Sequence, residues 1–366
     1  MSDPLHLHIE AVDTLMFRDG RPFNQHDAGA AEAVSVFPPY PPTIVGAVRL
    51  ALAKAHGFDG TGSTWPEDIV GTGVDWQGDA TLGPLQFSSI MVLHGEQIVF
   101  PVPLSVVEGH DASGDPQMTC LRPGAERDCD LGAKVHLPVP ARSDLQGIKS
   151  IDDRWLSEEG MEAVLAGRAP DRADLVARDE VWRNEPRVGI GIDIRNRRVN
   201  EGQLYMASHV RPGEATALYI EVSGTDLSDY PTGLTPLAGE HRMANISSGE
   251  RVHLPTSPSL KTENGAISYT VIHLSPCLLD RLPRPGESLD NLPGKVVSAC
   301  LGRPRVIGGW DSVQGRAIAM RPALPAGSVW FMETKQGEPD PTQFHATHIG
   351  KAPEWGFGQI LIGVWG

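Results

Sequence analysis

The sequence predicts an α+β protein in which strands outnumber helices. The chain has 40 glycines and 31 prolines among its 366 residues, and such an excess favours turns, short strands and long surface loops over a helical bundle. Short alternating runs dominate the second half, whereas only one segment of the first half has a clear helical period. The length predicts two domains or one large one.

The first elements are predicted from hydrophobic period. Residues 5–12 alternate apolar and polar side chains, which is typical of a half-buried strand. A helix is predicted from Thr43, its expected N-cap, to His56, with Gly57 ending it. Arg49 lies off the apolar face in this interpretation. It is therefore expected at the surface, either available to an anion or solvated in the ordinary way.

The middle of the chain predicts a hairpin over residues 85–107 and weak helices over 155–167 and 173–183. Residues 109–142 carry little pattern and are rich in proline, glycine and charge, so a long inserted loop is predicted there. The remaining strands are predicted at 203–210, 216–222, 251–254, 267–274, 296–301, 316–321, 328–333 and 359–365.

Composition restricts the class of function. The net charge of −15 argues against nonspecific coating of nucleic acid, which needs a basic surface, but allows a basic groove on an acidic body. Four scattered cysteines without a C-x-x-C pair predict reduced thiols, a cytoplasmic location and no zinc ribbon. The sequence has no apolar run of membrane-spanning length, no phosphate-binding loop, no nucleophile elbow and no H-E-x-x-H motif.

The most informative stretch is residues 185–211, because five arginines gather there around Gly189 and Gly191, which are interpreted as turns. Arginine can hold a phosphate through two N–H groups at once, so the stretch predicts one anionic partner bound in one place. The alternative is a solvated surface on which the arginines pair with nearby acids. The five arginines are Arg187, Arg195, Arg197, Arg198 and Arg211.

Three other segments could bind nucleic acid. Arg18 and Arg21 flank a turn in residues 17–23, whose phenylalanines could anchor it to the core or stack on bases. Gly356 and Gly358 could offer backbone N–H groups to phosphate or sugar, or could form a tight turn between sheets. Trp310 is either a wedge in the core or a platform for stacking.

A set of blocks occurs in order from Phe17 to Gly363: FRDGRPF, PPTIVGAVRLAL, RVGIGID, EGQLY, IGGWD, MRPALPAGSVWF and GFGQILIG. Together they resemble the third subunit of the Cmr effector complex of type III-B CRISPR systems, in the RAMP superfamily. The resemblance covers nearly the whole chain. It implies two ferredoxin-like (RRM-like) domains with antiparallel sheets and long loop insertions, which we expect at residues 1–195 and 196–366.

The resemblance also implies a function. The chain would be a noncatalytic subunit of an antiviral ribonucleoprotein, without metal or other cofactor. It would hold the 5′ tag of the guide RNA and contact the large polymerase-like signalling subunit and a backbone RAMP subunit. Fixing an RNA end requires phosphate contacts and pockets for unstacked bases. The candidate RNA-binding residues are Arg18, Arg21, Arg49, Arg187, Arg195, Arg197, Arg198, Gly356 and Gly358.

Two alternatives stay open at the level of sequence. One is a metal-independent endoribonuclease that processes guide RNA precursors, with a histidine such as His26 acting on the RNA 2′-hydroxyl. The other is a protein-only interaction module whose basic stretch meets an acidic partner.

Overall fold

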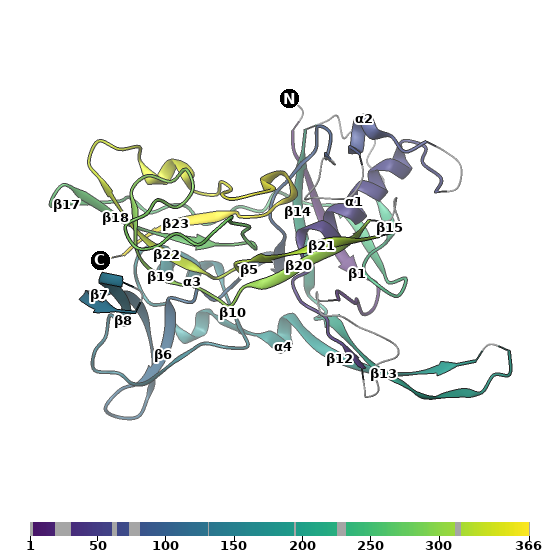
Figure 1. Cartoon of the computed structure of the whole chain (residues 1–366), viewed down its shortest axis with the longest axis horizontal. Helices are drawn as coiled ribbons and strands as arrows, with labels where there is room; N and C mark the ends of the chain where they lie inside the picture. Colours follow the sequence, from purple (N-terminus) through teal and green to yellow (C-terminus); the bar gives the residue numbers. More distant parts are fainter. Residues whose placement is uncertain are drawn as a thin grey trace. The chain divides into compact units, whose positions relative to one another are not determined.

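A computed structural model describes residues 3–18, 31–60, 64–72, 81–130, 132–193, 195–224, 232–311 and 316–365 (Figure 1). The chain forms two compact units, each assembled from three stretches of sequence. Unit 1 consists of Met1–Gly95, Asp179–Glu250 and Val306–Arg321, and unit 2 of Glu96–Arg178, Arg251–Arg305 and Pro322–Gly366. The compact units therefore alternate along the chain, whereas the predicted domains 1–195 and 196–366 are continuous.

The largest part of unit 1 is an antiparallel sheet with the strand order β4-β14-β1-β16-β15, with β3 pairing β14. The predicted first strand is confirmed as β1. Leu7 and Ile9 of β1 are buried, as expected from the alternation. The strands are β1 (Leu5–Ala11), β3 (Gln86–Phe87), β4 (Met91–His94), β14 (Thr216–Ser223), β15 (Gly233–Pro236) and β16 (Met243–Ser248).

The predicted helix is confirmed as α1 (Pro41–Ala55), but it begins two residues before Thr43. Tyr40 occupies the N-cap and no side chain caps the helix there. Two prolines at the start are tolerated because the first-turn N–H groups have no partner within the helix. The other elements of unit 1 are β2 (Ala31–Ala33), α2 (Glu67–Val70), α4 (Arg178–Val181), β12 (Trp182–Ile192), β13 (Val199–Pro212), β20 (Arg305–Asp311) and β21 (Arg316–Ala323).

Unit 2 is built from three sheets. One has the order β17-β18-β22-β19 with β23 pairing β18, one joins β5, β10 and β11, and one has the order β8-β7-β6-β9. The helix predicted at 155–167 is confirmed as α3 (Glu158–Leu165), whose first turn is capped by Ser157. The strands are β5 (Gln97–Pro101), β6 (Val106–His110), β7 (Pro116–Cys129), β8 (Gly132–Pro140), β9 (Gln146–Ser150), β10 (Arg154–Leu156), β11 (Leu175–Ala177), β17 (Thr262–Glu263), β18 (Ala266–His273), β19 (Lys295–Cys300), β22 (Val329–Lys335) and β23 (Ile360–Val364).

Three sequence-based predictions fail. Residues 173–183, expected as one weak helix, instead form part of a 3-10 turn, the strand β11, the four-residue helix α4 and the start of β12. Residues 109–142 are not a loop but contain β7 and β8, which pair from Leu121 with Pro140 to Cys129 with Gly132. The ladder has two register shifts, one after Pro123, which pairs with Pro138, and one between Arg127 and Cys129. Residues 251–254 form no strand. Short 3-10 turns complete the unit as η1 (Arg172–Asp174), η2 (Pro341–Phe344) and η3 (Pro353–Trp355).

Mostly antiparallel sheets with few helices confirm the predicted α+β class. Over the described part of the chain, no helix combines the length and apolar character needed to cross a membrane.

Candidate nucleic-acid interface

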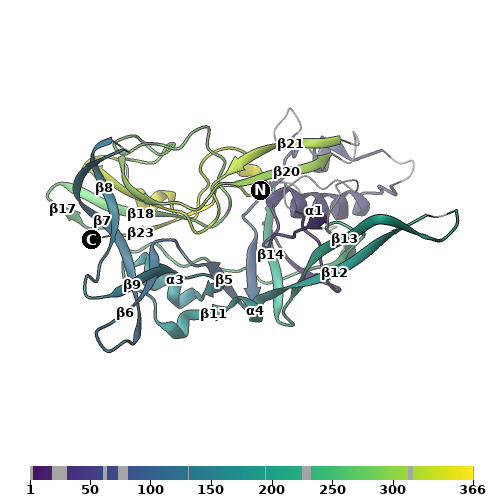
Figure 2. The same ribbon diagram turned by 60° about the horizontal axis from the view of Figure 1, so that its bottom comes forward.

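The arginine-rich stretch folds as a long β-hairpin of unit 1. β12 and β13 pair from Trp182 with Pro212 to Ile192 with Val199, and β13 also pairs in parallel with β2. Both views show this ribbon extending away from the sheet that contains β1 (Figures 1 and 2). Gly189 and Gly191 lie inside β12, so their interpretation as turns is wrong. The chain reverses instead between Asp193 and Arg198.

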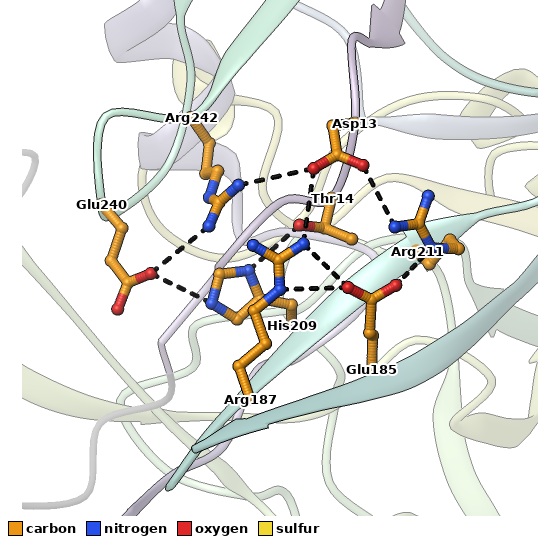
Figure 3. Close-up of polar contacts among 8 residues, drawn as sticks. All are labelled: Asp13, Thr14, Glu185, Arg187, His209, Arg211, Glu240 and Arg242. Atoms are coloured by element: carbon orange, nitrogen blue, oxygen red, sulfur yellow. Dashed lines mark hydrogen bonds and ion pairs between the residues drawn. The ribbon is translucent and has the colours of Figure 1, made fainter. Parts of the chain in front are cut away.

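At the base of the hairpin, two arginines are paired with two acids (Figure 3). The Arg187 Nη2 lies 2.8 Å from a Glu185 carboxylate oxygen and 3.4 Å from an Asp13 carboxylate oxygen. The Arg211 Nη2 lies 3.1 Å from the other Asp13 oxygen, and the Arg211 Nε pairs with Glu185. The Thr14 backbone N–H, then Arg211 and Arg187, hold the pKa of Asp13 below its usual value. Arg211 and Arg187 lower the pKa of Glu185 in the same way. The alternative interpretation, pairing with nearby acids, therefore holds for Arg187.

A buried histidine extends this acid–arginine cluster. The His209 Nδ1 and the Thr14 hydroxyl are hydrogen-bonded at 3.1 Å, and the His209 Nε2 lies 3.1 Å from a Glu240 oxygen. Arg242 lies 3.6 Å from both Glu240 and Asp13. Burial lowers the pKa of His209, and the nearby Glu240 partly opposes that shift. Three arginines thus face three carboxylates, and the cluster anchors the hairpin rather than presenting a net positive charge.

The tip of the hairpin has the opposite character. Arg195, Arg197 and Arg198 are exposed, and no side-chain partner is seen for them among the described residues. Asp193 is the acid nearest in sequence. Its carboxylate accepts hydrogen bonds from the Arg195 backbone N–H at 2.8 Å and from the Asn196 amide at 2.7 Å. The turn is held by its backbone, so the three guanidinium groups are left for a ligand.

One face of the hairpin between base and tip is apolar and exposed. Val188, Ile190 and Ile192 alternate along β12 with exposed fractions of 65%, 46% and 54%, and Val199 opposite Ile192 is 58% exposed. Glycines occupy the alternating positions between them in β12, so β12 contributes no side chain to the other face there. The hairpin therefore combines an aliphatic surface with a cationic tip.

Arg49 is not at the surface, and its assignment as an RNA contact is wrong. Its side chain is 1% exposed. Nε donates to the Val70 carbonyl at 2.7 Å and Nη2 to the Gly71 carbonyl at 3.1 Å. The guanidinium also lies 5.6 Å from the centre of the Trp65 ring. Burial lowers its pKa to about 10. Arg49 fastens the end of α2 to α1 and leaves nothing for phosphate.

Gly356 and Gly358 also serve the fold. Both are buried, and both have positive φ, at 86° and 74°. The Gly356 N–H donates to the Pro353 carbonyl and the Gly358 N–H to the Pro276 carbonyl. A Cβ on Gly358 would lie 1.9 Å from the Ile349 carbonyl oxygen. The donors proposed for phosphate are already used inside unit 2, as the tight-turn interpretation requires.

The remaining candidates lie elsewhere in the chain. Arg18 is exposed and forms a backbone bridge with Ser35, while Arg21 and His26 lie outside the described residues. Trp310 is 61% exposed, so it is not a core wedge. The predicted residues do not include Asp13, Glu240 and Arg242, because their roles depend on contacts between segments far apart in the chain.

Comparison with known proteins identifies the class. The family model described as CRISPR-associated protein (Cas_Cmr3) matches residues 7–365. A chain in a cryo-EM structure of the Type III-B Cmr-beta bound to cognate target RNA is 18% identical, with a TM-score of 0.51 over 89% of this chain and 86% of that one. At that identity the likeness concerns the fold alone. No curated protein sequence matches the chain.

Two further structures were compared. A chain of the same Cmr-beta complex bound to target RNA and AMPPnP is 17% identical, with a TM-score of 0.49 over 89% of this chain and 86% of that one. A chain of a Csm1-Csm4 cassette in complex with cA4 is 12% identical, with a TM-score of 0.36 over 91% of this chain and 87% of that one.

The family match over nearly the whole chain defines a CRISPR-associated protein. The chain belongs to the Cas_Cmr3 family of CRISPR-associated proteins. The predicted resemblance to the third Cmr subunit is thereby confirmed.

Proposed function

We propose that this chain is the noncatalytic subunit that holds the 5′ tag of the guide RNA, in a cytoplasmic complex acting in antiviral defence. The main support for this proposal is the tip of the β12–β13 hairpin. Three exposed arginines follow one another within four residues, and the acid beside them is occupied by the turn. Guanidinium groups arranged in this way suit successive phosphates of one strand. In this proposal the subunit also bridges the large signalling subunit and a backbone RAMP subunit.

The fixed base of the hairpin supports the proposal. Asp13 comes from the segment after β1, Glu185 and Arg187 from β12, and Arg211 from β13, so their ion pairs tie the hairpin to the main sheet (Figure 3). A tip carried on an anchored hairpin keeps its arginines in one place. Preorganisation of this kind reduces the entropy lost when a ligand binds.

We also propose that unit 1 is a ferredoxin-like domain. The order β16-β1-β14-β4, with every neighbour antiparallel, is that of a four-stranded RRM-like sheet, and α1 follows β1 in the chain. Between β14 and β16 the described residues hold the strand β15 instead of a second helix. The proposal of a second such domain rests on the family resemblance.

Replacing Arg195, Arg197 and Arg198 together by glutamine is the direct test of the RNA site. Binding of tag-bearing guide RNA by the assembled complex should weaken. The plot of log affinity against log salt concentration should become shallower by about 2, since three phosphate contacts are lost at roughly 0.7 each. The fold should be retained because the turn is held by its backbone and by Asp193.

A matched control removes the same charge elsewhere. Arg122, Arg251 and Arg284 are exposed arginines of unit 2, and their joint replacement by glutamine should leave the salt dependence unchanged. Equal losses from both triple variants would mean that only net charge matters. An unaltered affinity of the folded tip variant, inside the complex, would contradict the proposed site.

We propose further that the subunit does not itself cut RNA. The histidine that lies within the acid–arginine cluster, His209, has a side chain with 0% exposure, so it cannot reach a 2′-hydroxyl of a bound strand. Purified protein incubated with guide RNA precursor in EDTA should leave the RNA intact. Cleavage that disappears on a single histidine substitution, His26→Ala included, would favour the endoribonuclease instead.

A further inference from the structure

A second hairpin of the chain, β20–β21, exposes large apolar side chains. Ile307 and Ile318 are turned inward, with exposed fractions of 0% and 7%. Val306, Trp310 and Met320 face outward and are 46%, 61% and 54% exposed. Single exposed apolar side chains are common, but apolar side chains grouped on one face mark a binding surface.

Glycines shape the outer face of this hairpin. A Cβ on Gly308 would lie 3.1 Å from the Met320 Cγ, so the methionine side chain occupies the space over that glycine. Because side chains two apart in a strand share a face, Val306 and Trp310 flank Gly308 on the same side of β20. These residues form a shallow apolar surface on the hairpin, and the Trp310 indole at one end is its largest exposed group.

The charge of the hairpin differs in sign from that of the chain. Between its ends it contains Arg305, Arg316 and Arg321 against one acid, Asp311, on a protein of net charge −15. A positive local balance beside an exposed indole suits a ligand with both a flat aromatic face and negative charge. Nucleotides of a single strand have both features.

We propose that Trp310 is a stacking platform for an unpaired base of single-stranded RNA, at a site separate from the β12–β13 tip. The inference rests on the proposed function in so far as RNA is the ligand. The size of the surface favours a nucleotide over a protein partner. Three exposed apolar residues suit one or two bases, whereas a stable protein interface involves about 20 residues on each side.

Substitutions at Trp310 separate stacking from simple apolar contact. In the assembled complex, Trp310→Leu should lower the affinity for fluorescently labelled guide RNA by about 10-fold, because an aliphatic side chain cannot stack on a base. Trp310→Phe should retain affinity within about 3-fold. The unfolding midpoints of both variants should match the wild type, since the side chain is mostly exposed.

The salt dependence distinguishes this site from the hairpin tip. Stacking involves no phosphate, so Trp310→Leu should lower affinity at every salt concentration without changing the slope, whereas the Arg195, Arg197, Arg198 triple variant should change the slope. A slope change with the triple variant and wild-type affinity for Trp310→Leu would overturn the platform and leave the proposed function standing. No effect of either variant would overturn both.

A direct measurement uses the unmodified protein. Guide RNA carrying 5-iodouridine, irradiated within the wild-type complex, should crosslink to the peptide from Val306 to Arg316, identified by mass spectrometry. Crosslinks confined to other peptides would overturn the proposal. So would a Trp310→Leu subunit that binds RNA normally but fails to enter the complex, because that outcome assigns the surface to a protein partner.

Discussion

Replacing Arg49 by leucine is expected to lower the free energy of unfolding of unit 1 by about 3 kcal/mol. The guanidinium donates to the Val70 and Gly71 carbonyls at 2.7 and 3.1 Å while it is almost fully buried. Leucine leaves the Val70 carbonyl without this donor inside the fold, although Trp65 still donates to Gly71 at 2.9 Å. For a body of this size the thermal midpoint should fall by about 8 °C, as measured by circular dichroism.

A graded variant tests the geometry behind that expectation. Arg49→Lys keeps a positive charge but cannot span two carbonyls with one planar group, so its stability should fall between those of wild type and leucine. Normal stability of Arg49→Leu, combined with weaker RNA binding, would instead restore Arg49 as an RNA contact.

The sequence contained the signal that Arg49 is buried. It follows Val45 by four residues and precedes Leu52 by three, which places it on the same helical face as these residues. Both neighbours are 0% exposed. The polarity of arginine alone predicts a surface position, whereas its place on the helix indicates burial. The sequence could not show that the guanidinium donates to the Val70 and Gly71 carbonyls at the end of α2.

The hairpin illustrates a similar error. Gly189 and Gly191 alternate with Val188, Ile190 and Ile192, and this period of two indicates a strand. Glycine also favours turns, and that preference alone predicts a reversal earlier than the true one. The true turn, at Asp193 to Arg198, has no glycine and depends on Asp and Asn side chains that bond to the backbone.

Long-range partners lie beyond what local pattern can predict. Asp13 meets Arg187 and Arg211 only because the segment after β1 reaches β13, where Leu15 bridges Val210. Those ion pairs decide which arginines remain for a ligand. The arginine-rich stretch was thus correctly located as a feature of interest, while its division into an anchoring base and a cationic tip required the fold.

Acidification should destabilise unit 2 through a buried histidine. His273 is 1% exposed, and its Nε2 accepts a hydrogen bond from the Trp330 indole at 3.1 Å. Burial lowers its pKa from 6.5 to about 4. Between pH 6.5 and about 4, His273 is therefore protonated in the unfolded chain but neutral in the folded chain. The stability is present in full above pH 6.5 and is lost as pH falls towards 4.

The size of this loss can be measured against a variant that does not titrate. A difference of this size in pKa corresponds to roughly 3 kcal/mol. Burial also lowers the pKa of His345 and His348, which adds to the effect in the same direction. Glutamine at position 273 can accept from the indole but cannot take up the proton. Chemical denaturation from pH 7.5 to 4.5 should show wild type losing stability relative to His273→Gln. Parallel profiles would mean that His273 takes up its proton equally readily in the folded and the unfolded chain.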